Sequence, residues 1–221
     1  METVRFDELD LYPQVLRAIK EMGFEEATPI QSQAIPVVMS GVDVIGQAQT
    51  GTGKTASFGI PVLHKVDPNN KKTQVIILSP TRELAIQVSE EIRKLSKYMH
   101  GVKILPVYGG QDINRQIKAL KGGAQIIIGT PGRVMDHLRR KTIRCEAVNT
   151  IVLDEADEML KMGFVQDVEK IIESADPNRQ LVMFSATTNQ DVLTVSWKYQ
   201  HDPIEIVVQA EAENRPNITQ Y

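Results

Sequence analysis

The sequence predicts an α/β fold in which a mostly parallel, twisted sheet is covered by helices on both faces, giving three α/β/α layers. Short continuous runs of aliphatic residues recur along the chain, and amphipathic segments with helical spacing separate them. Strands of this continuous kind, without polar alternation, are buried on both faces. Hydrophobic residues make up 42% of the 221 residues and aromatic residues only 5%, which suits a core of Val, Ile and Leu.

The amino-terminal segment predicts two helices. Thr28 followed by Pro29 is typical of an N-cap and a first helical position, and Pro36 is expected to bend this second helix. The first helix is expected to end at Gly23, after apolar residues at helical spacing: Leu11, Val15, Ile19 and Met22.

The rest of the chain predicts alternating strands and helices. Strands are expected at 42–45, 75–78, 103–107, 126–128, 151–153 and 181–184, with the third weakened by Pro106. Helices are expected at 56–60, 82–98, 112–120, 131–140 and 164–174. Residues 1–209 are interpreted as one domain, and the polar stretch 210–221 as an exit linker.

Composition narrows the function classes. The net charge of −3 gives no global positive field, so a nucleic-acid site would have to be a local patch. The single Cys145 excludes an internal disulfide and a Cys-based zinc site, and the four His form no metal-ligand pattern. The first residues lack an apolar signal region and no stretch approaches the length of a membrane span, so we expect a cytoplasmic protein without a membrane partner.

A phosphate-binding loop follows the first expected strand. Its glycines allow a tight turn whose N–H groups point at an anion, and the following helix adds its positive dipole end. Lys54 can reach β- and γ-phosphates, and the Thr55 hydroxyl can ligate Mg²⁺. The common pattern opens with Gly, whereas this one opens with Ala48. The loop, called the cradle below, comprises Ala48, Gln49, Thr50, Gly51, Thr52, Gly53, Lys54 and Thr55.

An acidic group follows the strand at 151–153. Ligands bind at the carboxyl ends of parallel strands, where Asp154 can face the Mg²⁺ implied by Thr55. Glu155 can orient and deprotonate a water that attacks the γ-phosphate. A solvated acidic turn is the plain alternative. Together with the cradle upstream, the acidic group completes a nucleotide site, and this combination favours an NTPase.

These motifs belong to an ordered series that resembles the first RecA-like domain of the DEAD-box RNA helicases over essentially the whole chain. In that family the cradle opens with alanine, so Ala48 supports the resemblance. Thr188 stands where Met or Phe is more usual. The series is Phe6, 23–24, 28–31, 48–55, 80–85, 109–110, 130–133, 154–157 and 185–187.

The resemblance implies ATP and Mg²⁺ as cofactors. Within the family's Q-motif region, residues 4–32, Gln31 is implied as the reader of adenine, since a carboxamide offers one donor and one acceptor for N7 and N6. Thr28 is implied to cap a helix and hold Gln31. Either Phe24 or Phe6 can stack on the base. A core position at the end of the first helix is an equal alternative for Phe24.

The resemblance also implies RNA as a partner. Three loops carry the family's contacts to the RNA backbone, which would make binding independent of sequence. For any single arginine the alternative is a surface salt bridge, and for Arg82 a helix cap. The implied residues are Pro80, Thr81, Arg82, Gly109, Gly110, Gln111, Thr130, Pro131, Gly132 and Arg133.

The resemblance also implies residues that couple the nucleotide state to RNA unwinding, and a second domain in the whole protein. Asp157, Ser185 and Thr187 are implied to couple nucleotide state to unwinding, through hydroxyl hydrogen bonds to Asp157. The family supplies its transition-state arginines from a second RecA-like domain of the same protein. We therefore expect the amino-terminal half of a longer ATP-dependent RNA helicase, an ATP hydrolase that is nearly inactive alone.

Two other function classes compete. A P-loop kinase or GTPase shares the cradle, but a GTPase usually carries an Asn-Lys-x-Asp motif, which this sequence lacks. A binding module with a vestigial ATPase is the second. The presence of Lys54, Thr55, Asp154 and Glu155 argues against it.

Overall fold

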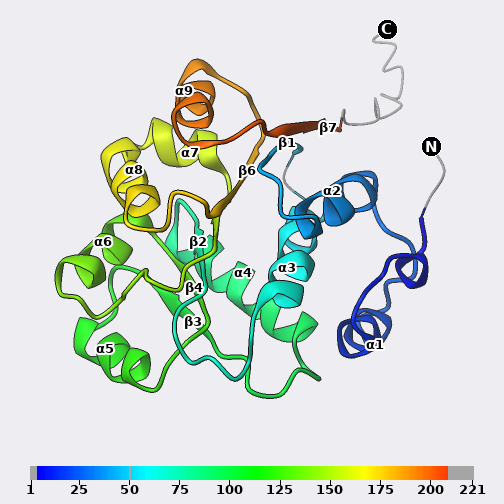
Figure 1. The fold of residues 1–221 in the computed structure, drawn as a ribbon, viewed down its shortest axis with the longest axis horizontal. Helices are drawn as coiled ribbons and strands as arrows, with labels where there is room; N and C mark the ends of the chain where they lie inside the picture. Colours follow the sequence, from blue (N-terminus) through cyan, green and yellow to red (C-terminus); the bar gives the residue numbers. More distant parts are fainter. Residues whose placement is uncertain (1–3, 50, 209–221) are drawn as a thin grey trace, which may run out of the picture.

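The sheet has seven strands, and every pairing between them is parallel. The computed structural model describes residues 4–49 and 51–208, so Thr50 and the expected linker 210–221 lie outside it. The strand order is β3-β4-β2-β5-β6-β1-β7 (Figure 1). The predicted fold class is confirmed. The strands are β1 (Val44–Gln47), β2 (Val75–Leu78), β3 (Ile104–Val107), β4 (Ile126–Gly129), β5 (Thr150–Leu153), β6 (Gln180–Ser185) and β7 (Ile204–Val207).

Helices connect the strands in the described part of the chain. A 3₁₀ turn, η1 (Phe6–Glu8), comes first. The α-helices are α1 (Pro13–Glu21), α2 (Pro29–Met39), α3 (Lys54–Lys65), α4 (Arg82–Leu95), α5 (Ile113–Lys121), α6 (Pro131–Arg139), α7 (Ala156–Lys161), α8 (Val165–Glu173) and α9 (Gln190–Tyr199). None of the helices in the described residues is long and apolar enough to cross a membrane.

Strands β1 to β6 each contribute to two cores, because successive side chains point to opposite faces of a sheet. In β2, Val75 and Ile77 pack with residues of α1 to α4. Ile76 and Leu78 pack on the other face with residues of α6 to α9. Both faces are therefore covered, which is why the strands are continuous aliphatic runs. The two helical layers lie on either side of the sheet in Figure 1.

Most expected elements are present, with boundaries shifted by a few residues. The first strand was expected at 42–45 and runs over Val44–Gln47. Thr28 caps α2 and Pro29 opens it, as predicted. Pro106 lies in β3, an edge strand that pairs only with β4, where a missing N–H costs little.

Four elements of the described residues were not predicted: η1, α7, α9 and β7. The apolar spacing of Val192, Val195 and Tyr199 was the available signal for α9. In β7, an edge strand, only Ile206 is buried, so its sequence lacks the continuous pattern of the central strands.

Candidate functional site

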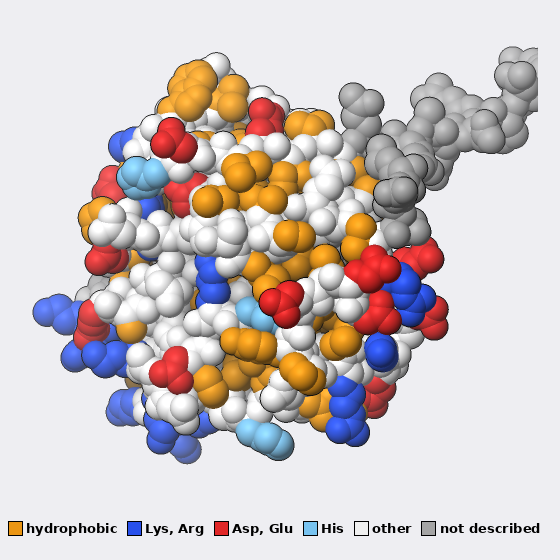
Figure 2. All heavy atoms as spheres, turned by 45° about the vertical axis from the view of Figure 1, so that its right-hand side comes forward, with side chains coloured by type: hydrophobic (Ala, Val, Ile, Leu, Met, Phe, Trp, Pro, Cys, Tyr) orange, Lys and Arg blue, Asp and Glu red, His pale blue; other side chains and the backbone are white. Residues whose placement is uncertain are grey.

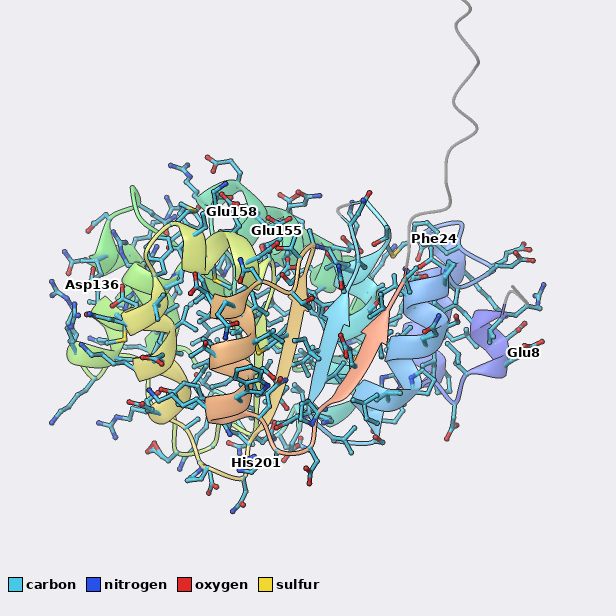
Figure 3. The ribbon with its side chains drawn as sticks, turned by 90° about the horizontal axis from the view of Figure 1, so that it is seen from above. Glu8, Phe24, Asp136, Glu155, Glu158 and His201 are labelled. Carbon is cyan, nitrogen blue, oxygen red and sulfur yellow. The ribbon has the colours of Figure 1, made fainter. Side chains whose placement is uncertain are left out.

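The implied residues gather where the parallel strands end. The cradle follows β1, Pro80 to Arg82 follow β2, and the loop 108–112 follows β3. Thr130 follows β4, and the acidic group follows β5. Glu155 lies at this end of the sheet, and His201, just before β7, lies at the opposite end (Figure 3). One end of the sheet therefore carries the cradle, the acidic group and the three loops implied in RNA contact.

The cradle depends on glycine at its turn into α3. Gly53, the N-cap residue, has φ 86°, a left-handed conformation that other residues rarely adopt. A Cβ at this position would lie 2.3 Å from Nε2 of Gln31. The close approach of Gln31 to the cradle is possible only because Gly53 has no side chain.

Gln31 connects α2 to the cradle. Its Oε1 accepts a hydrogen bond from the Thr28 N–H at 2.9 Å, and its Nε2 donates to the Gly53 oxygen at 3.2 Å. The Thr28 hydroxyl donates to the Thr52 oxygen at 2.9 Å. The interpretation of Thr28 as a cap that also holds Gln31 is confirmed. One donor and one acceptor position of the carboxamide stay available in the described structure.

A pocket of about 230 Å³ lies beside these residues, lined among others by Phe24, Thr28, Gln31 and Gly53. Phe24 is 53% exposed, so it is not a core residue, whereas Phe6 is 3% exposed. Both residues line the pocket. That one of them stacks on a base stays a prediction. Figure 3 shows Phe24 near the amino-terminal helices.

Glu91 of α4 also lines this pocket, and sequence reasoning missed it. Burial raises the pKa of its carboxyl, and a hydrogen bond with Thr55 opposes that rise. Its position between Val88 and Ile92 on the apolar side of α4 was the available signal.

Lys54 and Asp154 are buried at the centre of the site, 7% and 3% exposed. Neither Nζ of Lys54 nor Oδ1 of Asp154 has a hydrogen-bond partner among the described residues. Burial raises the pKa of Asp154 to about 7, opposed by the charge of Lys54 and supported by that of Glu155. A buried ammonium and a buried carboxylate without partners fit a phosphate and a divalent cation, which would satisfy both.

Glu155 follows with φ 53°, a left-handed conformation that is costly for a residue with a side chain. It is also the N-cap residue of α7. Asp154 is 3% exposed whereas Glu155 is half-buried, so the two neighbouring carboxylates differ in their access to solvent.

The coupling residues contact one another. Oδ2 of Asp157 accepts hydrogen bonds from the N–H and the hydroxyl of Thr187, at 3.0 and 2.9 Å. The Ser185 hydroxyl donates to the Thr187 oxygen. The Ala48 N–H donates to the Ser185 oxygen at 3.0 Å. The expected hydroxyl hydrogen bond to Asp157 is present from Thr187, whereas the Ser185 hydroxyl bonds to the Thr187 oxygen instead. These contacts link the acidic turn to the start of the cradle. The coupling role itself stays a prediction.

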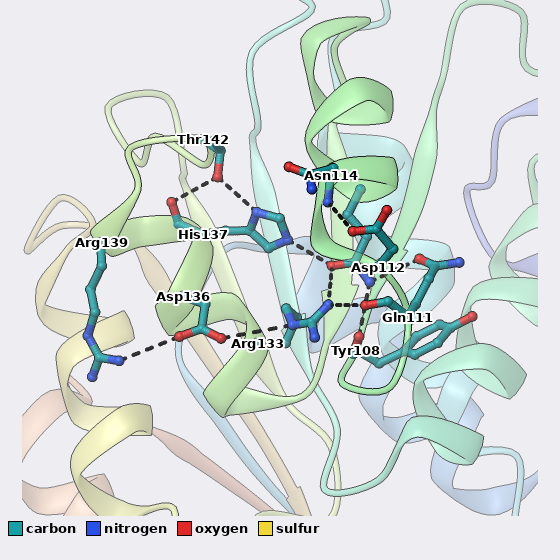
Figure 4. Close-up of polar contacts among 10 residues, drawn as sticks. Tyr108, Gln111, Asp112, Asn114, Arg133, Asp136, His137, Arg139 and Thr142 are labelled. Atoms are coloured by element: carbon teal, nitrogen blue, oxygen red, sulfur yellow. Dashed lines mark hydrogen bonds and ion pairs between the residues drawn. The ribbon is translucent and has the colours of Figure 1, made fainter.

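The loops implied in RNA contact are also joined. The exposed Arg82 lies with Cζ 5.0 Å from the ring centroid of Tyr108. The Thr81 side chain caps α4 by accepting from the Leu84 N–H at 3.2 Å. Nη1 of Arg133 donates to the Gln111 oxygen at 2.8 Å (Figure 4). Arg133 thus has contacts within the protein, and its side chain is only 14% exposed.

Acidic and basic side chains are mixed on the surface of the protein. On the face drawn in Figure 2, acidic and basic side chains mingle toward the rim, and hydrophobic side chains gather nearer the centre. This agrees with the net charge of −3 and leaves local groups, rather than a basic field, to attract an anionic partner.

Comparison with known proteins decides the family. The model of the DEAD/DEAH box helicase family matches residues 28–195, which include the cradle, the acidic group and the segment 185–187. The chain belongs to this family. Its RecA-like architecture is that of a solved DEAD box protein from the hyperthermophile Methanococcus jannaschii, with a TM-score of 0.89 and 45% identity. The match covers 94% of this chain and 57% of that one.

Several bacterial DEAD-box proteins are similar in sequence. The DEAD-box ATP-dependent RNA helicase CshA of Bacillus cereus is 52% identical over 216 residues, which are 98% of this chain and 41% of that protein. CshA of Bacillus subtilis is 50% identical over 219 residues, 99% of this chain and 44% of that protein. The chain therefore spans less than half the length of these relatives.

Proposed function

We propose that this chain is the amino-terminal ATP-binding domain of a DEAD-box RNA helicase. In this proposal it binds ATP with Mg²⁺ and the backbone of single-stranded RNA. Together with a second RecA-like domain it couples ATP hydrolysis to local unwinding of an RNA duplex. The observation that carries the proposal is the pair of buried groups on Lys54 and Asp154, beside the cradle, that have no hydrogen-bond partner among the described residues.

The catalytic roles are assigned to the chain's own groups. Lys54 and the cradle N–H groups hold the β- and γ-phosphates, while Thr55 and Asp154 hold Mg²⁺, which would neutralise charge on the phosphates. Glu155 orients the attacking water and takes its proton. The difference in burial supports this division, because Asp154 is 3% exposed while Glu155 is half-buried and more accessible to water.

Adenine recognition is assigned to Gln31. Its bonds to Thr28 and Gly53 use one N–H and one oxygen lone pair. The second N–H and the second lone pair can pair with N7 and the N6 amino group of adenine. Guanine offers an acceptor, O6, where adenine has the N6 donor, so the same carboxamide would select against GTP.

The test compares ATP and GTP binding by the 221-residue chain and by Gln31→Ala, using fluorescent nucleotide analogues. The expected result is a preference for ATP in the natural chain that falls at least about tenfold in the variant. An unchanged ratio of ATP to GTP affinity in Gln31→Ala would overturn the assignment.

The helicase activity belongs to the whole protein. Transition-state arginines from a second domain can contribute about 10³–10⁵ in rate, so the chain alone should hydrolyse ATP very slowly and with little RNA stimulation. In the longer parent protein, Glu155→Gln should hold ATP and RNA without turnover. Robust RNA-stimulated hydrolysis by this chain alone, or unchanged hydrolysis in Glu155→Gln, would contradict the proposal.

We assign the protein to the cytoplasm. A single cysteine, Cys145, buried and without a disulfide partner, supports a reducing compartment.

A further inference from the structure

Gln116 lies at the centre of a buried polar cluster behind two of the loops proposed to contact RNA. Its side chain is only 1% exposed. Its Nε2 donates to the Tyr108 oxygen and to Oε1 of Gln111, both at 3.0 Å. Its Oε1 lies 3.2 Å from Nη1 of Arg133 and 2.8 Å from Nε2 of His137. All four hydrogen-bonding positions of the carboxamide are used. Figure 4 shows the cluster.

His137 fixes the orientation of this carboxamide. The ring is fully buried, and burial, followed by the charge of Arg133, lowers its pKa. A carbonyl oxygen only accepts, so the neutral ring carries its proton on Nε2 and donates it to Gln116. Nδ1 lies 2.8 Å from the Thr142 hydroxyl, which holds the ring from the other side.

The cluster holds Arg133 by one side of its guanidinium. Nη1 donates to the Gln111 oxygen and to Gln116, and Nε lies 4.0 Å from Oδ2 of Asp136. Nη2 hydrogen-bonds to none of the described residues. Nε is buried without a hydrogen-bond partner among the described residues, so the anchor at Nη1 leaves the Nη2 donors held in a fixed direction. Phosphate recognition by arginine depends on donors that are held in this way.

The same cluster reaches the third loop. The main-chain oxygen of Tyr108 accepts a hydrogen bond from Gln116. Cζ of Arg82 lies 5.0 Å from the centroid of the Tyr108 ring. The residues implied in RNA contact at 82, at 109–111 and at 130–133 are therefore connected through one buried side chain, although they follow three different strands.

We propose that Gln116, oriented by His137, is a positioning residue for RNA binding that sets the relative placement of these loops. The proposal rests on the proposed RNA-binding function. It assigns Gln116 no contact with RNA. Its effect passes through Arg133 and the main chain at 108–111.

A merely structural role is the competing explanation, and the chain offers a matched control. Gln125 is also 1% exposed, and its side chain is held by three main-chain groups: Nε2 donates to the Pro68 and Gly101 oxygens, and Oε1 accepts from the Lys103 N–H. It precedes β4, whereas Thr130 follows that strand, so Gln125 lies at the opposite end of the sheet from the RNA loops.

The experiment measures the affinity of the 221-residue chain for a fluorescent oligouridylate over a series of salt concentrations. Variants are Gln116→Leu, Gln116→Glu and Gln125→Leu, with thermal unfolding and ATP affinity measured in parallel. Gln116→Glu keeps the acceptor for Arg133 and His137 and loses both donors, so it releases the 108–111 loop alone. This variant tests the inference if Gln116→Leu does not fold.

The expected result for Gln116→Leu is an RNA affinity about tenfold lower. Its salt slope should be shallower by about 0.7, the share of one phosphate contact on a single strand. ATP affinity should be unchanged. Gln116→Glu should lower RNA affinity less and keep the natural slope, since Arg133 stays anchored. Gln125→Leu should lose stability while keeping both RNA affinity and slope.

Two outcomes would overturn the inference and are distinguishable. If the natural chain binds RNA with no salt dependence, the proposed RNA site itself fails, and the inference fails with it. If the natural chain binds with a clear salt slope and the Gln116 variants match Gln125→Leu, the RNA site stands and Gln116 is only a stabilising residue.

Discussion

The side-chain amide of Gln31 donates a hydrogen bond to the main-chain oxygen of Gly53 at 3.2 Å. The residue proposed to read the base is thereby attached to the turn proposed to hold the phosphates. The same carboxamide also accepts a hydrogen bond from the Thr28 N–H. We therefore expect a substitution in the base pocket to alter the position of the cradle.

Gly53→Ala tests this attachment against Gly51→Ala. Both glycines have positive φ, 86° and 81°, so each substitution should cost about 1 kcal/mol in backbone strain. A Cβ at Gly53 also meets Nε2 of Gln31 at 2.3 Å, whereas a Cβ at Gly51 has nothing within 4 Å. We expect Gly53→Ala to cost about 3 kcal/mol in chemical denaturation and to abolish ATP binding. Equal losses in the two variants would count against the contact.

Asp154→Asn should stabilise the nucleotide-free chain. The carboxyl is 3% exposed, and burial raises its pKa to about 7, so at pH 8 the folded state must hold an unfavourable buried charge. An amide removes that charge, and the gain should be about 1–2 kcal/mol in thermal unfolding, with Mg²⁺-dependent ATP binding lost. The exposed Glu158→Gln is the control, expected to change neither. A lower melting temperature for Asp154→Asn would refute the prediction.

His64 should make stability depend on pH. Nδ1 donates to the Ile60 oxygen at 2.9 Å and Nε2 accepts from the Tyr12 N–H at 2.7 Å, which only a neutral ring can do. Burial lowers the pKa of His64 below 6.5, so below that pH the unfolded state binds more protons than the folded state. Stability is therefore complete above pH 6.5 and is lost as pH falls toward the folded pKa.

The measurement compares unfolding free energies of the natural chain and His64→Phe between pH 5 and 8. Phenylalanine can keep the stacking on Tyr12, whose ring centroid lies 4.2 Å away, but cannot titrate. The natural chain should show the steeper dependence, by at most about 1.4 kcal/mol per pH unit. His137, whose pKa is also lowered, is common to both proteins, so identical slopes would mean that His64 contributes nothing.

Thr187→Val removes one of the two hydrogen bonds to Asp157 and keeps the main-chain one. Because the pair is exposed, we expect a loss of about 0.5 kcal/mol. A double-mutant cycle with Asp157→Ala should give a coupling free energy of about 0.5–1 kcal/mol. Thr188→Val, whose hydroxyl bonds to none of the described residues, should be neutral. A coupling free energy of zero would mean that the hydroxyl contact contributes nothing.

Sequence alone predicted the central sheet and the motifs, for a physical reason. Strands buried on both faces must be apolar at every position, as β2 and β4 are, and phosphate loops need glycine at fixed places. The edge strand β7 is buried at Ile206 alone, so no pattern was available to reveal it.

Buried polar residues were beyond sequence reasoning. Gln116 and His137 lie on amphipathic helices, and the sequence does not distinguish a buried glutamine from one exposed to solvent. Only the partners at Tyr108, Gln111 and Arg133 identify Gln116 as buried and bonded, and these come from the loop after β3 and from α6. For Glu91 the position on the apolar side of α4 indicated burial, but its proximity to Thr55 depends on how α3 and α4 pack.

The position of β1 in the sheet has a consequence for biosynthesis. Val44 pairs with Val182 on one side and with Ile204 on the other, so both neighbours of this early strand are made late. During translation the cradle has no sheet to support it until β6 has left the ribosome, whereas β2, β4 and β5 can already associate. Acquisition of ATP binding would therefore report the last step of folding of this domain, and nascent chains that end before β6 should not retain the nucleotide.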